Sequence, residues 1–153
     1  MDLFAQLNEI GFPKLNLLDK PTFLRNMVFM HSLMLASEDL LEEAIKYANG
    51  DLLDYYKDHI EEERGHAEWL ANDLYQIGVQ VGEPHYLAAA CAGTQYYLIR
   101  HIHPIALLGY MAVLEGYPMP MEWVERLEIE YGIEPLRTLR YHAEHDVDHR
   151  KDL

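Results

Sequence analysis

Hydrophobic residues recur at steps of three and four along most of the chain, a spacing typical of amphipathic α-helices. Proline, glycine and asparagine divide this pattern into segments. The first predicted helix begins at Pro21 and stops at Asn49-Gly50, and the second begins at Asp51 and stops near Gly78. No segment alternates apolar and polar residues as a half-buried strand would, so the sequence predicts an all-α fold.

The second half of the chain continues the helical pattern. After a break at residues 82–84, a helical run covers residues 85–103, and Pro104 should kink or end it before the pattern resumes over residues 105–117. A short helix is expected over residues 121–132. The last helix should start around Glu134-Pro135, because proline is tolerated in a first helical turn. We therefore expect one helical domain over residues 1–153, with about six to seven helices.

Three predicted helices carry a glutamate on their apolar face. Glu38 lies in the middle of an apolar stripe of the first helix, Glu63 lies at the centre of the apolar arc of the second, and Glu115 shares the apolar side of the helix after Pro104. His66 follows Glu63 by one turn. A buried carboxylate is costly unless a cation, a proton or hydrogen-bond donors compensate it, so each of these acids requires a partner.

The last helix concentrates possible metal ligands in "RYHAEHDVDHR", residues 140–150. His142, Asp146 and His149 fall within about 60° of one another, because steps of four and three return to the same helix face. His145 lies at the margin of this face, whereas Glu144 and Asp148 point elsewhere. A charged amphipathic helix end is the simpler alternative for this segment.

Four inward carboxylates, two of them followed three residues later by histidine, form the ligand set of a carboxylate-bridged di-iron or di-manganese site. Glu62 is also one turn from His66, but it points away from the apolar arc, so Glu63 is the better candidate. For His31 and His59 we favour core packing or hydrogen bonding to ligand carboxylates.

Three segments resemble the heme-oxygenase-like di-iron oxidases, a family of seven-helix proteins also labelled iron-containing redox enzymes. They are "HIEEERGHAEWLANDLYQIG", "HPIALLGYMAVLEGYP" and "YHAEHDVDH". The resemblance implies a heme-oxygenase-like helical bundle, reduced or clipped at the C-terminus because this chain is shorter and ends four residues after His149. It also implies two Fe(II) per chain, with manganese as the other option. The implied metal ligands are Glu63, His66, Glu115, His142, Asp146 and His149, with Glu38 as the glutamate of the first helix.

Charge and composition limit the kinds of partner that this chain is expected to bind. The 26 acidic residues exceed the 12 basic ones and give a formal net charge of -14, which disfavours nucleic acid and anionic membranes. No apolar run is long enough to span a bilayer. Cys91 is the only cysteine and the first residues have no signal-peptide pattern, so we expect a cytoplasmic protein. The sequence leaves open whether the chain forms a homodimer.

The leading hypothesis is a non-heme di-iron oxidase or oxygenase. It would use dioxygen to oxidise or cleave a small, amino-acid-derived substrate, as the resemblance implies. A ferritin-like iron-binding protein is the first alternative, and it would need the acids, His66 and His149 but not His142. A metal-free or heme-related helical binding module is the second, with its inward acids satisfied by hydrogen bonds.

Overall fold

The structure is a computed structural model that describes residues 19–116, 119–132 and 136–152, with side chains described up to residue 146. All regular secondary structure in these ranges is helical, so the predicted all-α class is confirmed. The helices are α2 (Lys20–Tyr47), α3 (Asp51–Glu63), α4 (His66–Gln76), α5 (Tyr86–His101), α6 (Ala106–Leu114), α7 (Met121–Tyr131) and α8 (Arg137–Asp152). The predicted start of the last helix at Glu134-Pro135 lies outside the described residues.

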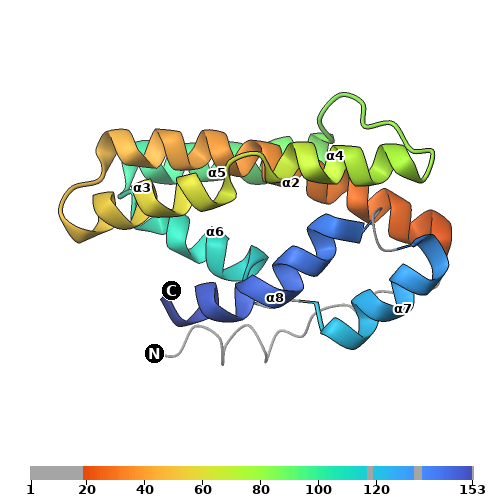
Figure 1. Ribbon diagram of the computed structural model, residues 1–153. Helices are drawn as coiled ribbons and strands as arrows, with labels where there is room; N and C mark the ends of the chain where they lie inside the picture. Colours follow the sequence, from red (N-terminus) through yellow and green to blue (C-terminus); the bar gives the residue numbers. More distant parts are fainter. Residues whose placement is uncertain (1–18, 117–118, 133–135, 153) are drawn as a thin grey trace.

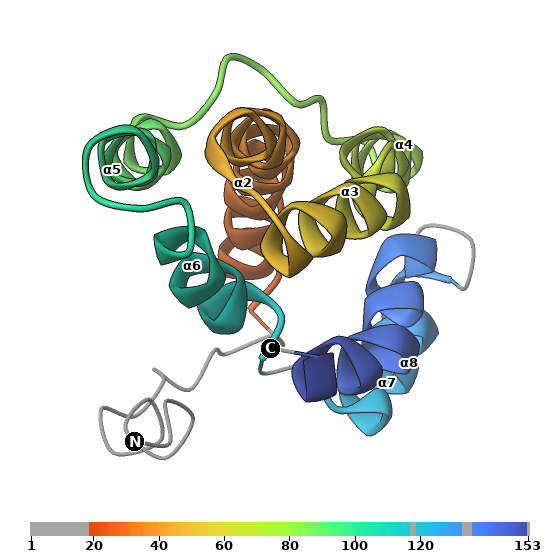
Figure 2. The same ribbon diagram turned by 90° about the vertical axis from the view of Figure 1, so that its left-hand side faces the viewer.

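The long helix α2 is the centre of the bundle. It packs against α5, α4 and α3, while α8 packs against α4 and α7 (Figure 1). Seen along its length, the bundle has α5, α2 and α4 in one layer, with α6, α3 and the α7–α8 pair beneath them (Figure 2). None of the described helices is both long and apolar enough to cross a membrane.

Most helix ends lie where the sequence predicts them. The Asp19 side chain accepts a hydrogen bond from the backbone N–H of Thr22 at 3.3 Å, and proline occupies the first turn of α2. Gly50, with φ of 57°, precedes α3. Pro104 lies in the connection between α5 and α6, so the expected break at this proline is also confirmed.

The single long helix predicted from Asp51 to Gly78 is wrong, because the chain breaks between Glu63 and His66. Arg64 is extended and Gly65 has a φ of 87°, in the left-handed region that favours glycine. The apolar spacing continues across the break, so periodicity alone could not reveal it. An oxygen of the Glu38 carboxylate accepts a hydrogen bond from the Gly65 N–H at 3.1 Å and thereby fixes the break against α2.

The buried apolar side chains form two clusters that meet along α2. One cluster fills the space between the C-terminal half of α2 and helices α3, α5 and α6, and the other joins its N-terminal half to α4, α7 and the start of α8. Glu38 lies between the two groups of α2 residues. The α3–α4 break, which Glu38 holds, therefore lies where the two cores meet.

Candidate metal centre

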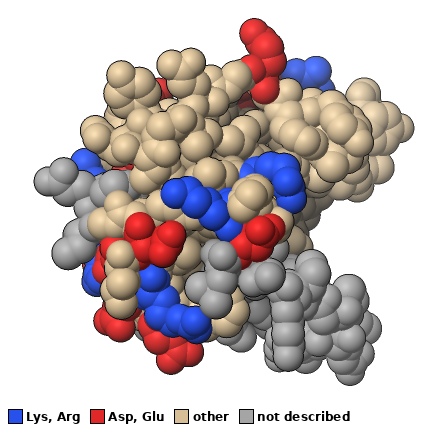
Figure 3. All heavy atoms as spheres, turned by 90° about the vertical axis from the view of Figure 1, so that its right-hand side faces the viewer, with Lys and Arg blue, Asp and Glu red and all other residues tan. Residues whose placement is uncertain are grey.

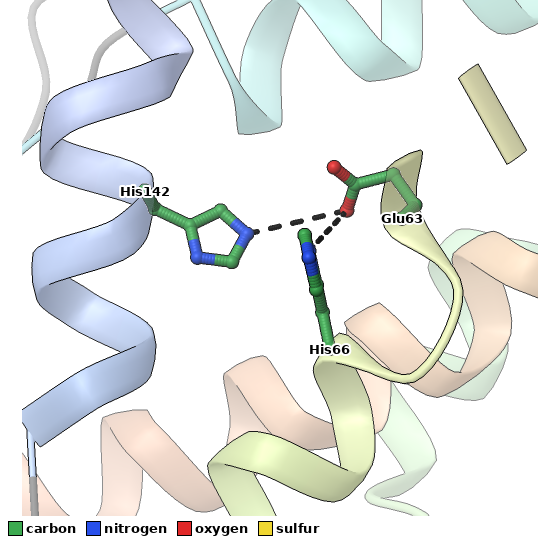
Figure 4. Close-up of side chains that lie close together, drawn as sticks. All are labelled: Glu63, His66 and His142. Atoms are coloured by element: carbon green, nitrogen blue, oxygen red, sulfur yellow. Dashed lines mark ion pairs between the residues drawn. The ribbon is translucent and has the colours of Figure 1, made fainter. Parts of the chain in front are cut away.

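The break between α3 and α4 brings Glu63 and His66 face to face. Glu63 is the last residue of α3 and His66 the first of α4. Nδ1 of His66 lies 3.4 Å from Oε2 of Glu63, and the side chains are 3% and 13% exposed, respectively (Figure 4). The Glu-x-x-His spacing thus places acid and histidine together across a turn rather than along one continuous helix.

His142 approaches the same carboxylate from α8. Its Nε2 atom lies 4.0 Å from Oε2 of Glu63 (Figure 4). Its Nδ1 atom donates a hydrogen bond of 2.8 Å to the backbone oxygen of Thr138, since a carbonyl can only accept. This bond keeps a proton on Nδ1, so Nε2, which faces Glu63, is the nitrogen that a metal would bind in the neutral imidazole.

These three side chains have a spacing that suits a shared metal ion. One ligand atom from each of Glu63, His66 and His142 lies within 4.8 Å of the others. Two ligand atoms bound at about 2.1 Å to one metal are about 3.0 Å apart at right angles and about 4.2 Å apart when opposite. The measured separations of 3.4 and 4.0 Å from the Glu63 oxygen fall inside that range.

The hydrogen bonding around the cluster is incomplete. Oε1 of Glu63 and Nδ1 of His66 are buried and have no hydrogen-bond partner among the described residues. The short approach of Nδ1 to Oε2 lacks the geometry of a hydrogen bond. Buried polar atoms are normally satisfied, and cations bound at this cluster would satisfy these two atoms. The residues present therefore fit a metal ion.

The charges around Glu63 keep its carboxylate ionised, as a ligand of a cation must be. Burial raises the pKa of Glu63, but the adjacent imidazoles of His142 and His66 outweigh burial and hold this pKa far below its usual range. Burial lowers the pKa of His142, but the carboxylates of Glu63 and Asp146 and the Thr138 carbonyl together raise it above 6.5. The acid is ionised at neutral pH, and a metal at this site competes with protonation of His142.

A second acid-histidine pair lies one helical turn away. Oε1 of Glu115, at the end of α6, is 3.3 Å from Nε2 of His59. His59 is buried and stacks on Tyr55 at 5.6 Å between ring centroids. It precedes Glu63 by four residues on α3, so the two side chains share one face of that helix. His59 thus contacts a predicted ligand carboxylate, which is the arrangement the sequence favoured for it.

The remaining predicted ligands have different positions relative to the cluster of Glu63, His66 and His142. Asp146 is 5% exposed and follows His142 by one turn of α8, close enough for its charge to act on that imidazole. Glu38 is partly buried and uses one oxygen on the Gly65 N–H. His149 lies on α8, but its side chain is outside the described residues. The described structure therefore brings Glu63, His66 and His142 into one cluster and places the other acids next to it.

Aromatic side chains, to which the sequence analysis gave no role, cover one side of the cluster. The His66 ring lies 4.5 Å from the ring of Trp69 and 4.9 Å from that of Tyr141. The guanidinium of Arg137 lies 4.2 Å above the Trp69 ring. The signal in the sequence was spacing, since Trp69 follows His66 by three residues and Tyr141 precedes His142. These rings exclude water from the imidazole of His66.

Three further buried carboxylates, those of Glu43, Asp73 and Glu128, were missed, and all three make structural contacts, Glu128 with Arg140 at 2.6 Å. Glu43 is hydrogen-bonded to Arg100 of α5 at 2.6 Å and to Lys46 at 3.0 Å, which lowers its pKa to about 2. Asp73 of α4 accepts a hydrogen bond of 2.8 Å from the backbone N–H of Thr138, in the first turn of α8. Asp73 therefore fixes the start of the helix that carries His142.

Comparisons with protein-family models, with curated proteins and with solved structures gave no match. The fold class rests on the helices themselves, and the family resemblance rests on the three sequence segments that suggested it.

Proposed function

We propose that this chain is a non-heme metalloprotein that binds two iron ions and uses dioxygen to oxidise or cleave a small substrate. The observation that carries the proposal is the buried cluster of Glu63, His66 and His142, which come from three different helices. Its imidazole and carboxylate ligands suit iron, and manganese accepts the same donors.

The first metal ion would lie between these three side chains. Glu63, His66 and His142 would hold this ion, and a carboxylate such as that of Glu63 can also serve a second ion. The second ion would draw on the carboxylate of Asp146, one turn from His142 along α8, and on that of Glu115, which contacts His59 one turn before Glu63 on α3. His149 and Glu38 complete the ligand set that the sequence suggested.

Bound Fe(II) supplies the electrons that reduce dioxygen, and the chain supplies the surroundings. Thr138 orients His142 through its carbonyl, and His59 orients the carboxylate of Glu115. Trp69 and Tyr141 cover His66 and limit the access of water on that side. The substrate is expected to be small, because the site lies inside a single bundle of helices.

The position of His142 favours this proposal over a ferritin-like iron store. The ferritin-like ligand set does not require that histidine, yet its Nε2 atom is directed at the Glu63 carboxylate. A metal-free helical module is supported by Glu38 and Glu115, which have protein partners at Gly65 and His59. That alternative leaves the buried atoms Oε1 of Glu63 and Nδ1 of His66 unexplained.

The decisive experiment is reconstitution with Fe(II) under anaerobic conditions, followed by metal analysis and rapid mixing with dioxygen. We expect about two irons per chain and a transient absorbance that is absent from the metal-free protein. Binding of less than about one iron per chain would overturn the proposal. Assembly of the chains into a hollow cage would point to the storage protein instead.

Two histidine variants of this chain provide a matched test of the assigned site. Replacement of His142 by Asn should lower the iron content and abolish the absorbance change. Replacement of His101 by Asn should change neither, because His101 is exposed at the end of α5. Equal iron content in the two variants would show that the metal binds elsewhere.

A further inference from the structure

Helix α5 lies at the edge of the bundle and has one side that no described element covers (Figure 2). It packs on α2 and α6 through a narrow buried stripe of Ala88, Ala92 and Ile99. Opposite this stripe, Tyr86 and Tyr97 are 74% and 62% exposed. Large apolar side chains that are this exposed on one helix face indicate a surface that is covered in the assembled protein.

The exposed side of α5 has a symmetric pattern of large and small residues. At about 100° per residue, Tyr86, Ala90, Gly93, Thr94 and Tyr97 fall on one stripe along the helix. The three small residues occupy the middle, and a tyrosine lies toward each end. In an antiparallel pair of such helices, the small residues would let the two backbones approach closely, and each tyrosine would lie beside the tyrosine at the opposite end of the other copy's stripe, so the face is complementary to itself.

Three polar side chains on this side, besides the tyrosine hydroxyls, already make contacts within the chain. The hydroxyl of Thr94 donates to the backbone oxygen of Ala90 at 3.1 Å, which leaves its methyl group to face outward. The Arg100 guanidinium is paired with the buried carboxylate of Glu43 at 2.6 Å. The ring of His101 lies 4.6 Å from that of Tyr97. Covering this side would therefore leave few polar groups without partners.

Charge also favours a second copy at this helix. The whole chain carries a net charge of -14, so two copies repel one another over most of their surfaces. No aspartate or glutamate occurs from Pro84 to Leu114, a stretch that includes all of α5 and α6. The space-filling view shows a wide area without charged side chains at its upper right, where α5 begins (Figure 3).

The available area is sufficient for association. The exposed parts of Tyr86, Tyr97 and Leu87 on α5, and of Ile102 and Ile105 in the turn that follows it, amount to roughly 600 Å². The exposed small residues between them add to this area, and a standard interface buries about 800 Å² from each partner. We propose that two copies of this chain associate through α5, with their α5 helices antiparallel about a twofold axis that passes between Ala90 and Gly93.

The test is the oligomeric state of the full chain, measured by light scattering or sedimentation from about 1 to 100 μM. We expect a dimer at the upper concentrations. Ala90→Glu places two like charges across the axis and should give a monomer. Ile129→Glu introduces the same charge at a residue that is 87% exposed on α7, and it should remain dimeric. Tyr97→Asp provides a second disruptive variant, and circular dichroism verifies that each variant keeps its helix content.

Two outcomes would overturn the proposal. The first is a wild-type chain that is monomeric up to 100 μM, as it would be if residues 1–18 of the same chain covered α5. The second is a dimer that survives in folded Ala90→Glu and Tyr97→Asp, because the copies would then meet through another face. Neither outcome depends on the metal site, since metal content is measured separately.

Discussion

Glu63 is the residue that all the contacts of the candidate metal centre share. Its Oε2 atom faces an imidazole from α4 at 3.4 Å and another from α8 at 4.0 Å, while its Oε1 atom is buried without a hydrogen bond among the described residues. Two imidazoles keep this carboxylate ionised despite its burial. Its negative charge, more than its size, is therefore what a metal would need from this position.

Replacement of Glu63 by Gln tests that charge at nearly constant volume. We expect the affinity for Fe(II) to fall at least about 100-fold, because even the partners of metal ligands contribute about 10- to 100-fold. The measurement is titration with Fe(II) under anaerobic conditions. Glu61→Gln on the same helix is the control, since Glu61 is 71% exposed and pairs only with Arg64 in the described structure. An equal loss in both variants would contradict the assignment.

The raised pKa of His142 predicts how metal binding depends on pH. A metal ligates the neutral imidazole, so binding must release the proton that Glu63 and Asp146 help to retain. The affinity should therefore be full well above the raised pKa and should begin to fall above pH 6.5 as the solution is acidified. Metal-free protein behaves oppositely, because protonation of a group with a raised pKa stabilises the folded state at low pH.

Measurement of bound Fe(II) between about pH 8 and pH 5.5 checks this dependence. The His142→Asn variant, which lacks the titrating ligand, should show a weaker dependence over the upper part of this range. A wild-type occupancy that stays constant down to about pH 4 would contradict ligation by histidine.

The break between α3 and α4 is the element that assembles the cluster. Gly65 adopts a φ of 87°, and its N–H is held by the Glu38 carboxylate. Replacement of Gly65 by Ala should destabilise the fold by about 1 kcal/mol, because a Cβ atom disfavours this backbone conformation. Gly109→Ala in the middle of α6, where a Cβ would meet open space, should instead stabilise it by about 0.5–1 kcal/mol.

Urea unfolding of the two metal-free variants gives both free energies. Iron binding by Gly65→Ala should also weaken, since a shift at the break moves His66 relative to Glu63. Stabilisation by Ala at residue 65 would show that the break is not fixed by the glycine.

The break between α3 and α4 is also the main feature of the fold that the sequence did not predict. Spacing located α2, α5 and α7 and placed Glu38, Glu63 and Glu115 away from solvent, because burial of an apolar face governs both features. It could not show that Gly65 leaves the helix, since glycine is also tolerated inside helices. It also missed Glu43 and Asp73, because their burial depends on Arg100 and on the Thr138 N–H, which are distant in sequence.

On the scale of the whole molecule, the candidate site lies where two hydrophobic clusters meet. Helices α3, α5 and α6 surround one cluster, whereas α4, α7 and the start of α8 surround the other. A metal bound by Glu63, His66 and His142 would link α3, α4 and α8, and so would connect the two clusters directly. At about 1,000 times its Kd, such an ion would stabilise the folded chain by about 4 kcal/mol.

Hydrogen exchange with and without metal measures where that stabilisation acts. Metal should slow the exchange of amides in α8 and at the α3–α4 break, because the side chains that would hold it lie on these segments and would resist local opening once it is bound. Amides of α5, which provides none of the proposed ligands, should be slowed only if they exchange by global unfolding. Zinc serves as a redox-inert substitute in this measurement, since it accepts the same imidazole and carboxylate ligands. Protection that appears in α5 but not in α8 would place the metal in a different part of the bundle.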